Sequence, residues 1–210
     1  MNLIHSTPAT STSETRGAVQ KMLQYMEMRR CIDRIFDRVD SPRIVAVTSL
    51  VPGEGKTTFC LAAAWSLAER LGRKVLVVDT ANMVRSKSTI LSDVCGVEMD
   101  RPFEVQKVQG GPASMSYTWI PPSMGSTRAL KSQIERLSAD FDVVIMDTVA
   151  LSISSRLEND PLEMASVANA MVLVRGETRI ELDANIKLEE LQNAGVRVLG
   201  IVANRFGGVA

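Results

Sequence analysis

Short apolar runs alternate with amphipathic segments along the chain from about residue 41 onward. The apolar runs are rich in β-branched residues and show no alternating polar face, at positions 43–48, 74–78, 141–146, 170–175 and 198–203. Between them, apolar residues recur at helical spacing over 57–71 and again at Leu130, Ile134 and Leu137. Buried strands separated by helices predict an α/β fold with a mostly parallel β-sheet and helices on both faces.

Residues typical of helix ends refine this pattern. Gly72 follows the first long helical segment and is expected to end it in the left-handed conformation. Asp160, Pro161 and Glu163 combine an N-cap, a proline at the first helical position and an acidic residue at N3. A helix with a capping box should begin there. A weaker strand is predicted over 117–120, before two prolines.

The first 40 residues do not follow this alternation. Residues 6–13 are rich in Ser and Thr and offer too little apolar surface to offset the entropy of ordering them, so we expect 1–18 to be a disordered tail. From Val19 onward, apolar residues recur at roughly helical spacing among charged ones, which predicts an amphipathic N-terminal helix over 19–40. Residues 41–207 are then expected to form one folded domain.

Composition is typical of a globular protein and sets aside several classes of partner. Of the 210 residues, 45% are hydrophobic and 23% are charged, and 24 basic residues balance 24 acidic ones. Because the net charge is zero, the protein as a whole does not attract nucleic acid or an anionic membrane electrostatically, so neither is expected as a partner. No stretch approaches the ~18 consecutive apolar residues of a membrane span, which predicts no direct membrane insertion.

The cysteines and the histidine form no recognisable metal or disulfide pattern. Cys31, Cys60 and Cys95 are far apart, and the single histidine, His5, lies in the predicted tail. Isolated thiols fit a reducing compartment. Because the N-terminus also lacks the apolar core of a signal peptide, we expect a cytoplasmic protein.

A glycine-rich loop separates the first predicted strand from the first long helix and reads Ser-Leu-Val-Pro-Gly-Glu-Gly-Lys-Thr-Thr at positions 49–58. Gly53 and Gly55 let the backbone turn so that successive N–H groups and the helix N-terminus point at phosphate oxygens. Lys56 is expected to reach the β- and γ-phosphates, and the hydroxyl of Thr57 to bind Mg²⁺. The predicted domain is therefore a P-loop NTPase.

This loop departs from the usual phosphate-binding spacing at one position. The pattern G-x-x-x-x-G-K-[ST] would place its first glycine at Leu50, so the interpretation rests on the strand-loop-helix context. The alternative is a glycine turn with an exposed lysine. As a phosphate loop, the segment supplies nucleotide-binding residues Gly53, Glu54, Gly55, Lys56, Thr57 and Thr58.

Two acidic residues, Asp79 and Asp147, end predicted strands. The carboxyl ends of parallel strands share one edge with the phosphate loop, so these groups should converge. We expect Asp147 to hold Mg²⁺ with Thr57, and Asp79 to orient or deprotonate the attacking hydroxyl or water, or to join the metal site. Lys56, Asp79 and Asp147 are thus the predicted catalytic residues. The alternative is that such an aspartate forms a helix cap or a turn.

The order of motifs resembles the bacterial tyrosine kinases of exopolysaccharide export. In chain order the motifs are P-G-E-G-K-T-T, K-V-L-V-V-D, F-D-V-V-I-M-D-T, A-N-A-M-V-L-V-R and V-L-G-I-V-A-N-R, and the resemblance covers residues 25–207. The same superfamily of variant P-loop ATPases includes division-site and partition ATPases. The resemblance implies ATP or ADP with Mg²⁺ as cofactors, with Asn204 at the adenine ring and Arg205 beside it in the nucleotide site.

The resemblance also implies a setting for the protein. The family includes cytoplasmic ATPase domains that partner polysaccharide co-polymerases, so the expected partner is an inner-membrane polysaccharide co-polymerase. The expected location is cytoplasmic, peripheral to the inner membrane through that partner. Glu27 and Arg30 match part of the E-x-x-R-x-x-R helix through which these kinases form rings, which is compatible with a homo-oligomer. The second arginine of that pattern would fall on Asp33, with Arg34 one place later, and the alternative is a solvated helix face.

Several positions depart from the family pattern. Ala81 replaces the second acidic residue of the motif D-x-D-x-R that usually ends the second strand. The chain has two tyrosines, Tyr25 and Tyr117, in place of a C-terminal tyrosine cluster. We therefore expect good binding of Mg-ATP with weak or absent tyrosine kinase activity.

Three functions remain open from the sequence. The first is the ATP-binding partner of a co-polymerase, and the second is a positioning ATPase of the division-site type. The third is a non-catalytic module that senses ATP. Val51 stands where the division-site ATPases carry a signature lysine and argues against the second function, whereas Ala81 keeps the third open.

Overall fold

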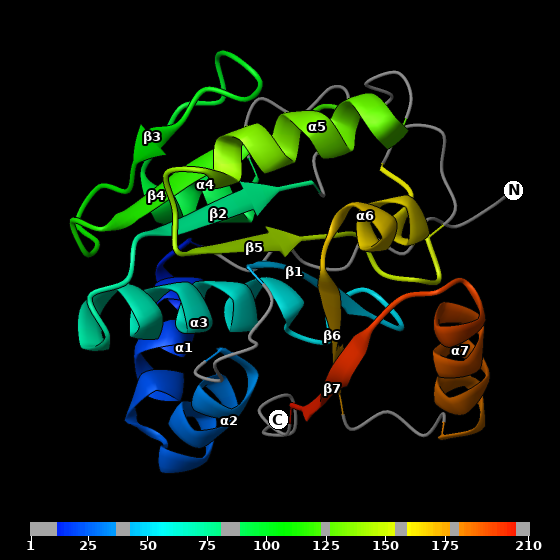
Figure 1. The fold of residues 1–210 in the computed structure, drawn as a ribbon. Coiled ribbons are helices and arrows are strands. Elements are labelled where there is room, and N and C mark those ends of the chain that lie inside the picture. Colours follow the sequence, from blue (N-terminus) through cyan, green and yellow to red (C-terminus); the bar gives the residue numbers. More distant parts are fainter. Residues whose placement is uncertain are drawn as a thin grey trace, which may run out of the picture.

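The computed structural model of the chain describes residues 12–36, 43–80, 89–122, 127–153, 159–176 and 181–204. Its strands are β1 (Ile44–Ser49), β2 (Val75–Asp79), β3 (Gln106–Lys107), β4 (Met115–Trp119), β5 (Val143–Asp147), β6 (Ala170–Arg175) and β7 (Val198–Ala203). They form one seven-stranded sheet in the order β3-β4-β2-β5-β1-β6-β7 (Figure 1). Every neighbouring pair is parallel except β3 with β4.

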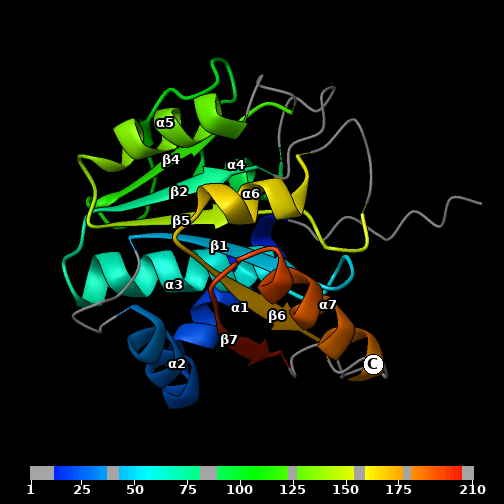
Figure 2. The same ribbon diagram turned by 45° about the vertical axis from the view of Figure 1, so that its right-hand side comes forward.

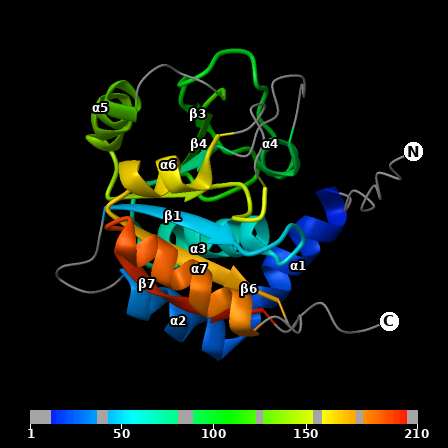
Figure 3. The ribbon, with the colours of Figure 1, turned by 90° about the vertical axis from the view of Figure 1, so that its right-hand side faces the viewer.

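Helices cover both faces of the sheet. They are α1 (Thr12–Gln24), α2 (Met26–Phe36), α3 (Lys56–Arg70), α4 (Ile90–Cys95), α5 (Thr127–Ser138), α6 (Pro161–Val167) and α7 (Glu181–Asn193). The first four pack with one large apolar cluster on one face, and the last three with a second cluster on the other face (Figures 2 and 3). The predicted α/β fold with helices on both faces is confirmed.

The N-terminal region contains more helix than the sequence predicted. Helix α1 begins at Thr12, inside the segment 1–18 that was expected to be a disordered tail. A break at Tyr25 divides the single helix predicted from residue 19 into α1 and α2. Helix α1 is stabilised because Val19 and Met22 are buried against the rest of the domain. The composition of the preceding Ser/Thr-rich run gives no sign of this tertiary packing. Residues 37–40 lie outside the described part.

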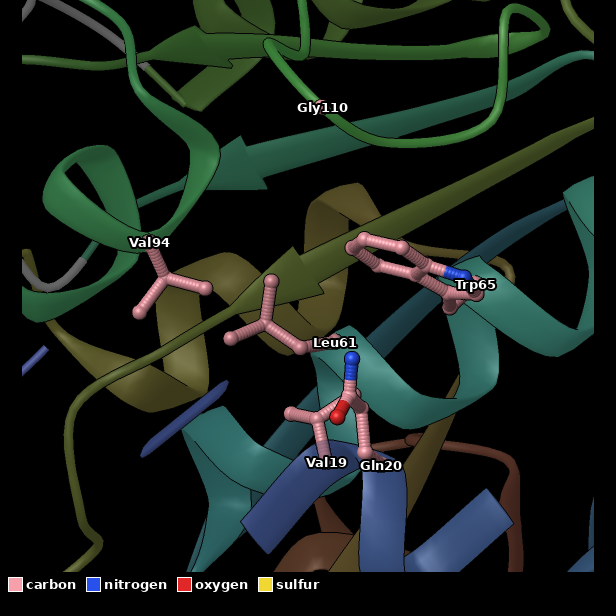
Figure 4. Close-up of a pocket in the computed structure, with 6 residues that line it drawn as sticks. All are labelled: Val19, Gln20, Leu61, Trp65, Val94 and Gly110. Carbon is pink, nitrogen blue, oxygen red and sulfur yellow. The ribbon is translucent and has the colours of Figure 1, made fainter. Parts of the chain in front are cut away.

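A small gap remains where α1 meets α3 and α4 (Figure 4). The cavity has a volume of 120 Å³ and is lined by Val19, Gln20, Leu61, Trp65, Val94 and Gly110. Small-molecule sites usually enclose at least ~300 Å³. This cavity is therefore a packing gap under α1 and not a binding site for a nucleotide.

The helix-end signals are confirmed in part. Gly72 has φ 62°, the left-handed conformation expected after α3. The side chain of Asp160 caps α6 by accepting a hydrogen bond from the N–H of Leu162 at 2.8 Å. Glu163 does not close the predicted capping box, because its carboxylate accepts a hydrogen bond of 2.6 Å from the hydroxyl of Thr127 on the neighbouring α5.

The sequence did not predict two short elements, helix α4 and strand β3, and it predicted strand β4 only as a weak strand. Helix α4 and strand β3 are too short to show a periodic apolar pattern. Strand β4, predicted as a weak strand over 117–120, is instead an internal strand paired with both β2 and β3. Its burial explains why apolar and small polar residues alternate along it without an exposed face.

Candidate nucleotide-binding site

The loop between β1 and α3 passes twice through the left-handed region. Gly53 has φ 88° and Gly55 has φ 89°, values that residues with side chains rarely adopt. Gly55 is the N-cap of α3, and its carbonyl accepts the hydrogen bond of the Phe59 N–H at 2.9 Å. The first N–H groups of a helix have no partner within that helix, so α3 presents its positive end at Lys56 and Thr57.

The side chain of Glu54 is built into the loop. It is 5% exposed, and its Oε2 accepts hydrogen bonds from the N–H groups of Leu50 at 2.8 Å and Val51 at 3.0 Å. Its Oε1 accepts a third, from the N–H of Gly176 at 3.0 Å. The carboxylate therefore ties the loop to the end of β6. The sequence named Glu54 as a nucleotide-binding residue, and the structure assigns its carboxylate to the loop itself.

Asn204 anchors the same loop from the end of β7. Its backbone N–H donates to the carbonyl of Arg175 at 2.6 Å, and its Nδ2 donates to the carbonyl of Glu54 at 2.9 Å. A Cβ placed on Gly55 would lie 2.3 Å from Nδ2 of Asn204, so only glycine fits there without displacing that side chain. Arg205, predicted beside Asn204, lies outside the described residues.

Lys56, Thr57 and Asp147 meet at the carboxyl end of β5. The hydroxyl of Thr57 donates a 2.7 Å hydrogen bond to Oδ2 of Asp147, and Nζ of Lys56 lies 3.6 Å from Oδ1. The Asp147 side chain is only 2% exposed. Among the described residues no group donates a hydrogen bond to its Oδ1. Buried carboxylate oxygens are normally hydrogen-bonded, so this oxygen is positioned to receive a cation or a donor that arrives with a ligand.

The oxygen atoms at this point suit Mg²⁺. Hydroxyl and carboxylate oxygens are the ligands that this ion prefers, and Thr57 and Asp147 supply one of each. The described residues contain no group of three or more His, Cys, Asp or Glu side chains that could hold a metal. An ion at Thr57 and Asp147 would therefore take its other ligands from water and phosphate, as Mg²⁺ does in nucleotide sites.

Cys60 lies one helical turn beyond Lys56 on α3. Burial raises the pKa of its thiol well above the usual range, and the negative charge of Asp147 raises it further. The Cys60 thiol is therefore held in its neutral form beneath the site.

Asp79 is the neighbour of Asp147 in the sheet, in register across β2 and β5. Its side chain is fully buried, and Oδ2 accepts hydrogen bonds from the hydroxyl of Thr89 and from the hydroxyl of Tyr117, the latter at 3.3 Å. Burial raises the pKa of Tyr117, and the charge of Asp79 raises it further, so Tyr117 stays protonated and remains a donor. The predicted convergence of the two aspartates is present, but Asp79 faces a different set of partners from Asp147.

Sequence reasoning did not find the residues that hold Asp79. Thr89 is the N-cap of α4, where its hydroxyl also accepts the N–H of Ser92 in a capping box. The spacing of Thr89 and Ser92 was the available signal, but the helix that follows is only six residues long. For Tyr117 the sequence predicted a place in a weak strand and no role at the site. Ala81, the substituted acidic position, lies outside the described residues.

Hydrogen bonds to backbone carbonyls connect the strand ends that carry Asp79 and Asp147. Both the N–H and the hydroxyl of Thr80 donate to the carbonyl of Asp147, at 3.0 and 2.9 Å. Nδ2 of the buried Asn159 donates to the carbonyls of Thr80 at 2.9 Å and Ile120 at 3.3 Å. The ends of β2, β4 and β5 are thereby joined, which limits how far Asp147 can move.

Comparison with known proteins identifies the family. A family model described as the CobQ/CobB/MinD/ParA nucleotide binding domain matches residues 45–210, from β1 through the last strand. The chain belongs to this family. The members named in that description include the division-site protein MinD, in agreement with the variant P-loop superfamily expected from the motifs.

Curated relatives point to one branch of the family. The chain is 29% identical over 187 residues to the tyrosine-protein kinase CpsD of Streptococcus pneumoniae, covering 80% of this chain and 78% of that protein. It is also 29% identical over 184 residues to the CpsD of Streptococcus agalactiae, covering 78% of this chain and 75% of that protein. The chain is homologous to the CpsD tyrosine kinases, as the motif resemblance predicted.

Solved structures share the fold. The kinase domain of the Escherichia coli tyrosine kinase ETK matches with a TM-score of 0.72 at 18% identity, covering 100% of this chain and 87% of that one. The Pyrococcus furiosus cell division ATPase MinD matches with a TM-score of 0.63 at 24% identity, covering 80% of this chain and 74% of that one. At these identities the likeness concerns the fold alone. Within the described residues no helix is long and apolar enough to cross a membrane.

Proposed function

We propose that the protein is a cytoplasmic ATP-binding protein of the bacterial tyrosine kinase family that works with an inner-membrane polysaccharide co-polymerase in exopolysaccharide or capsule synthesis and export. The observation that carries nucleotide binding is the meeting of Lys56, Thr57 and Asp147 at the start of α3, where one buried carboxylate oxygen accepts no hydrogen bond from the described residues. The homology to the CpsD tyrosine kinases supports the wider assignment.

In this proposal the loop and α3 hold the phosphates of ATP or ADP. The contacts come from the backbone N–H groups of Gly53, Glu54, Gly55, Lys56, Thr57 and Thr58. Lys56 exchanges its ion pair with Asp147 for the β- and γ-phosphates, and Thr57 and Asp147 hold Mg²⁺. When bound, the ion neutralises the charge that develops on the phosphate oxygens during transfer.

Asp79 is proposed as the residue that orients or deprotonates the attacking hydroxyl or water, or that joins the metal site. It acts on a substrate only when its carboxylate turns from Thr89 and Tyr117 toward the phosphates, because it is fully buried against them. Asn204 is proposed at the adenine ring, where its backbone bond to β6 supports it, with Arg205 beside it.

Weak or absent kinase activity is part of the proposal. Ala81 provides no second carboxylate next to Asp79, and removing a group that positions the nucleophile or the metal typically costs ~10²–10⁴-fold in rate. Tyr117 is buried and hydrogen-bonded to Asp79, and Tyr25 is 46% exposed at the break between α1 and α2. Neither tyrosine belongs to a cluster that neighbouring subunits would phosphorylate.

A homo-oligomer formed through α2 is a further part of the proposal. Glu27, Arg30 and Arg34 all line one side of α2, since positions three and seven residues apart share a helix face. Asp33, where the family pattern has its second arginine, is instead paired with Arg70 on α3. The neighbouring Arg34 is exposed and lies on the same side of α2 as Arg30.

The test is ATP turnover with Mg²⁺, measured for the protein alone and with the cytoplasmic segments of a candidate co-polymerase. Slow turnover that the partner accelerates supports the proposal. If the protein binds ATP but shows no turnover, either alone or with the co-polymerase segments, it is a non-catalytic ATP sensor. If it dimerises with ATP and the co-polymerase segments have no effect, it is a positioning ATPase.

Ala81→Asp should raise turnover at least severalfold with little change in affinity. Wild-type turnover equal to that of an active kinase, with no gain in Ala81→Asp, would contradict the weak-activity part.

A further inference from the structure

The carboxylate of Asp79 is held by two hydroxyl groups from other parts of the fold. Its Oδ2 accepts hydrogen bonds from the hydroxyl of Thr89, the N-cap of α4, and from the hydroxyl of Tyr117 on β4 at 3.3 Å. Asp79 and Tyr117 are both fully buried. A buried carboxylate oxygen depends on its donors because bulk water does not reach it, so the two hydroxyls determine where Oδ2 lies.

The donors of Asp79 lie on the side of β2 that faces away from Asp147. Strand β2 lies between β4 and β5 in the sheet (Figure 1), and Asp79 is in register with Asp147 of β5. Tyr117 belongs to β4. Helix α4 is joined to the connection between β3 and β4, where the N–H of Gln109 donates to the carbonyl of Cys95 at 2.8 Å. Oδ2 of Asp79 is thus held on the β4 side, away from the carboxylate of Asp147.

The separation of the two aspartates has an electrostatic reason. Neighbouring strands lie about 4.8 Å apart, and Asp79 and Asp147 are both buried, so two ionised carboxylates facing each other would repel. Nζ of Lys56 lies 3.6 Å from Oδ1 of Asp147 and offsets one of the two charges. The hydroxyls of Thr89 and Tyr117 stabilise the other charge. A divalent cation beside Asp147 would remove the repulsion and favour the approach of Asp79.

We propose that Thr89 and Tyr117 are positioning residues that hold Asp79 on the β4 side until Mg-ATP occupies the site, and then release it. This inference rests on the proposed function and names how its site is controlled. The hydroxyl of Thr89 also accepts a hydrogen bond of 3.1 Å from the N–H of Ser92. That bond does not involve Asp79, so α4 keeps its cap when the carboxylate turns away.

Tyr117 provides a signal by which its contact with Asp79 can be followed. The chain has two tyrosines, so protein labelled with meta-fluorotyrosine gives two fluorine NMR resonances, and Tyr25→Phe assigns them. Asp79→Asn keeps the shape of the side chain and removes the charge that the Tyr117 hydroxyl faces. The resonance in this variant marks the position expected for Tyr117 without the carboxylate.

Mg-ATP should move the Tyr117 resonance from its position in the free protein toward the position found in Asp79→Asn. ATP with EDTA should leave the resonance near its starting position, because no cation offsets the repulsion between Asp79 and Asp147. Isothermal titration on the same samples shows that nucleotide is bound in both cases. The comparison therefore separates release of Asp79 from the mere presence of nucleotide.

ATP turnover tests the same contact without a label. Tyr117→Phe removes only the hydroxyl, so Asp79 is released more easily, and kcat should rise about threefold or more with little change in KM for Mg-ATP. Thr118→Val is the matched control. It removes a buried hydroxyl from the next position of β4, on the opposite face of the sheet, and this hydroxyl forms no hydrogen bond within the described part of the chain. Its kcat should equal that of the wild type.

Three results would overturn the inference. They are a Tyr117 resonance that stays in place while Mg-ATP binds, an equal movement with ATP in EDTA, and a lower kcat in Tyr117→Phe, which would mean that Tyr117 holds Asp79 in its working position. If the protein turns over no ATP, the resonance alone decides. Failure to bind ATP is a different result, because it contradicts the proposed function and, with it, any control of the site.

Discussion

Thr57 and Asp147, which lie 90 residues apart in the chain, are joined by a 2.7 Å hydrogen bond from the hydroxyl of the first to Oδ2 of the second. The end of β5 and the first turn of α3 are thus in contact. The same carboxylate has Lys56 on its other oxygen at 3.6 Å. In the proposed function, Mg-ATP would therefore bind by exchanging the partners of Asp147.

Asp147→Asn should separate metal-dependent from metal-free binding. The amide keeps the shape of the side chain and removes its charge, so the gain in ATP affinity on adding Mg²⁺ should shrink while binding without metal is kept or improves. Isothermal titration with ATP, with and without Mg²⁺, measures both. Asp140→Asn, at an exposed position, is the control. An equal Mg²⁺ effect in Asp147→Asn and wild type would show that Asp147 is structural.

Lys56→Ala should weaken both ATP and ADP. The loss of a charge-assisted contact with phosphate is worth about 1.5–3 kcal/mol, or roughly 10- to 150-fold in Kd. Titration of the folded variant measures the change, and Lys74→Ala at an exposed position serves as the control. If the affinities for both nucleotides stay at the wild-type value, the loop does not bind phosphate through this lysine.

Gly55→Ala and Gly53→Ala form a matched pair, because both glycines have φ near 90° but differ in their surroundings. Each substitution should cost about 1–2 kcal/mol of unfolding free energy from backbone strain. Gly55→Ala should cost more, since its Cβ would lie 2.3 Å from Nδ2 of Asn204, whereas a Cβ on Gly53 meets nothing within 4 Å.

Urea unfolding of these glycine variants in a second background isolates the contact. In Asn204→Ala the extra cost of Gly55→Ala should disappear, which makes the two glycine substitutions equivalent. A penalty for Gly55→Ala that is unchanged in Asn204→Ala would mean that strain alone accounts for it.

Glu54→Gln should destabilise the loop although it changes little in shape. The carboxylate accepts three backbone N–H groups with its two oxygens, whereas an amide has one acceptor oxygen and turns its NH₂ toward a donor. The expected loss is about 1–3 kcal/mol of unfolding free energy. Glu104→Gln, at an exposed position, should have almost no effect. Equal stability of the two variants would rule out the three-way contact.

Cys31 should react slowly with thiol reagents, and its rate should depend on Arg34. Burial raises the pKa of the Cys31 thiol, and the charge of Arg34 partly lowers it again. Less thiolate is therefore present at pH 8 than in a free cysteine, and the rate should keep rising as the pH approaches the raised pKa. Arg34→Ala should raise the pKa further and slow the reaction at fixed pH. A faster reaction in that variant would show that Arg34 acts by covering the thiol.

The sequence was sufficient for elements that carry a long apolar pattern. Strands β6 and β7 have the bounds expected from the runs 170–175 and 198–203, because both are continuous apolar runs. Strand β6 is buried as predicted, whereas Gly200, Ile201 and Ala203 are exposed because β7 lies at the edge of the sheet. The approach of Asp147 to Lys56 and Thr57 could also be expected, since parallel strands share their carboxyl edge with the loop.

The sequence could not reveal contacts between residues that lie far apart in the chain. Glu54 reaches Gly176 across 122 positions, and Tyr117 reaches Asp79 across 38. Nothing in the local spacing of these residues distinguishes a carboxylate that binds backbone from one that faces a ligand. The early start of α1 has the same origin, because the burial of Val19 depends on a partner surface on α3 and α4.

The anchoring of the phosphate loop by Asn204 ties this site to the order in which the chain is made. Glu54 leaves the ribosome 150 residues before Asn204, and only the last strand brings that anchor into place. A nascent chain that has not yet added β7 therefore holds the loop sequence without its support. A ligand stabilises only the states that bind it, so in the proposed function ATP would favour chains that contain β7 over chains that do not. In this way ligand binding at the loop would depend on a strand made 150 residues later.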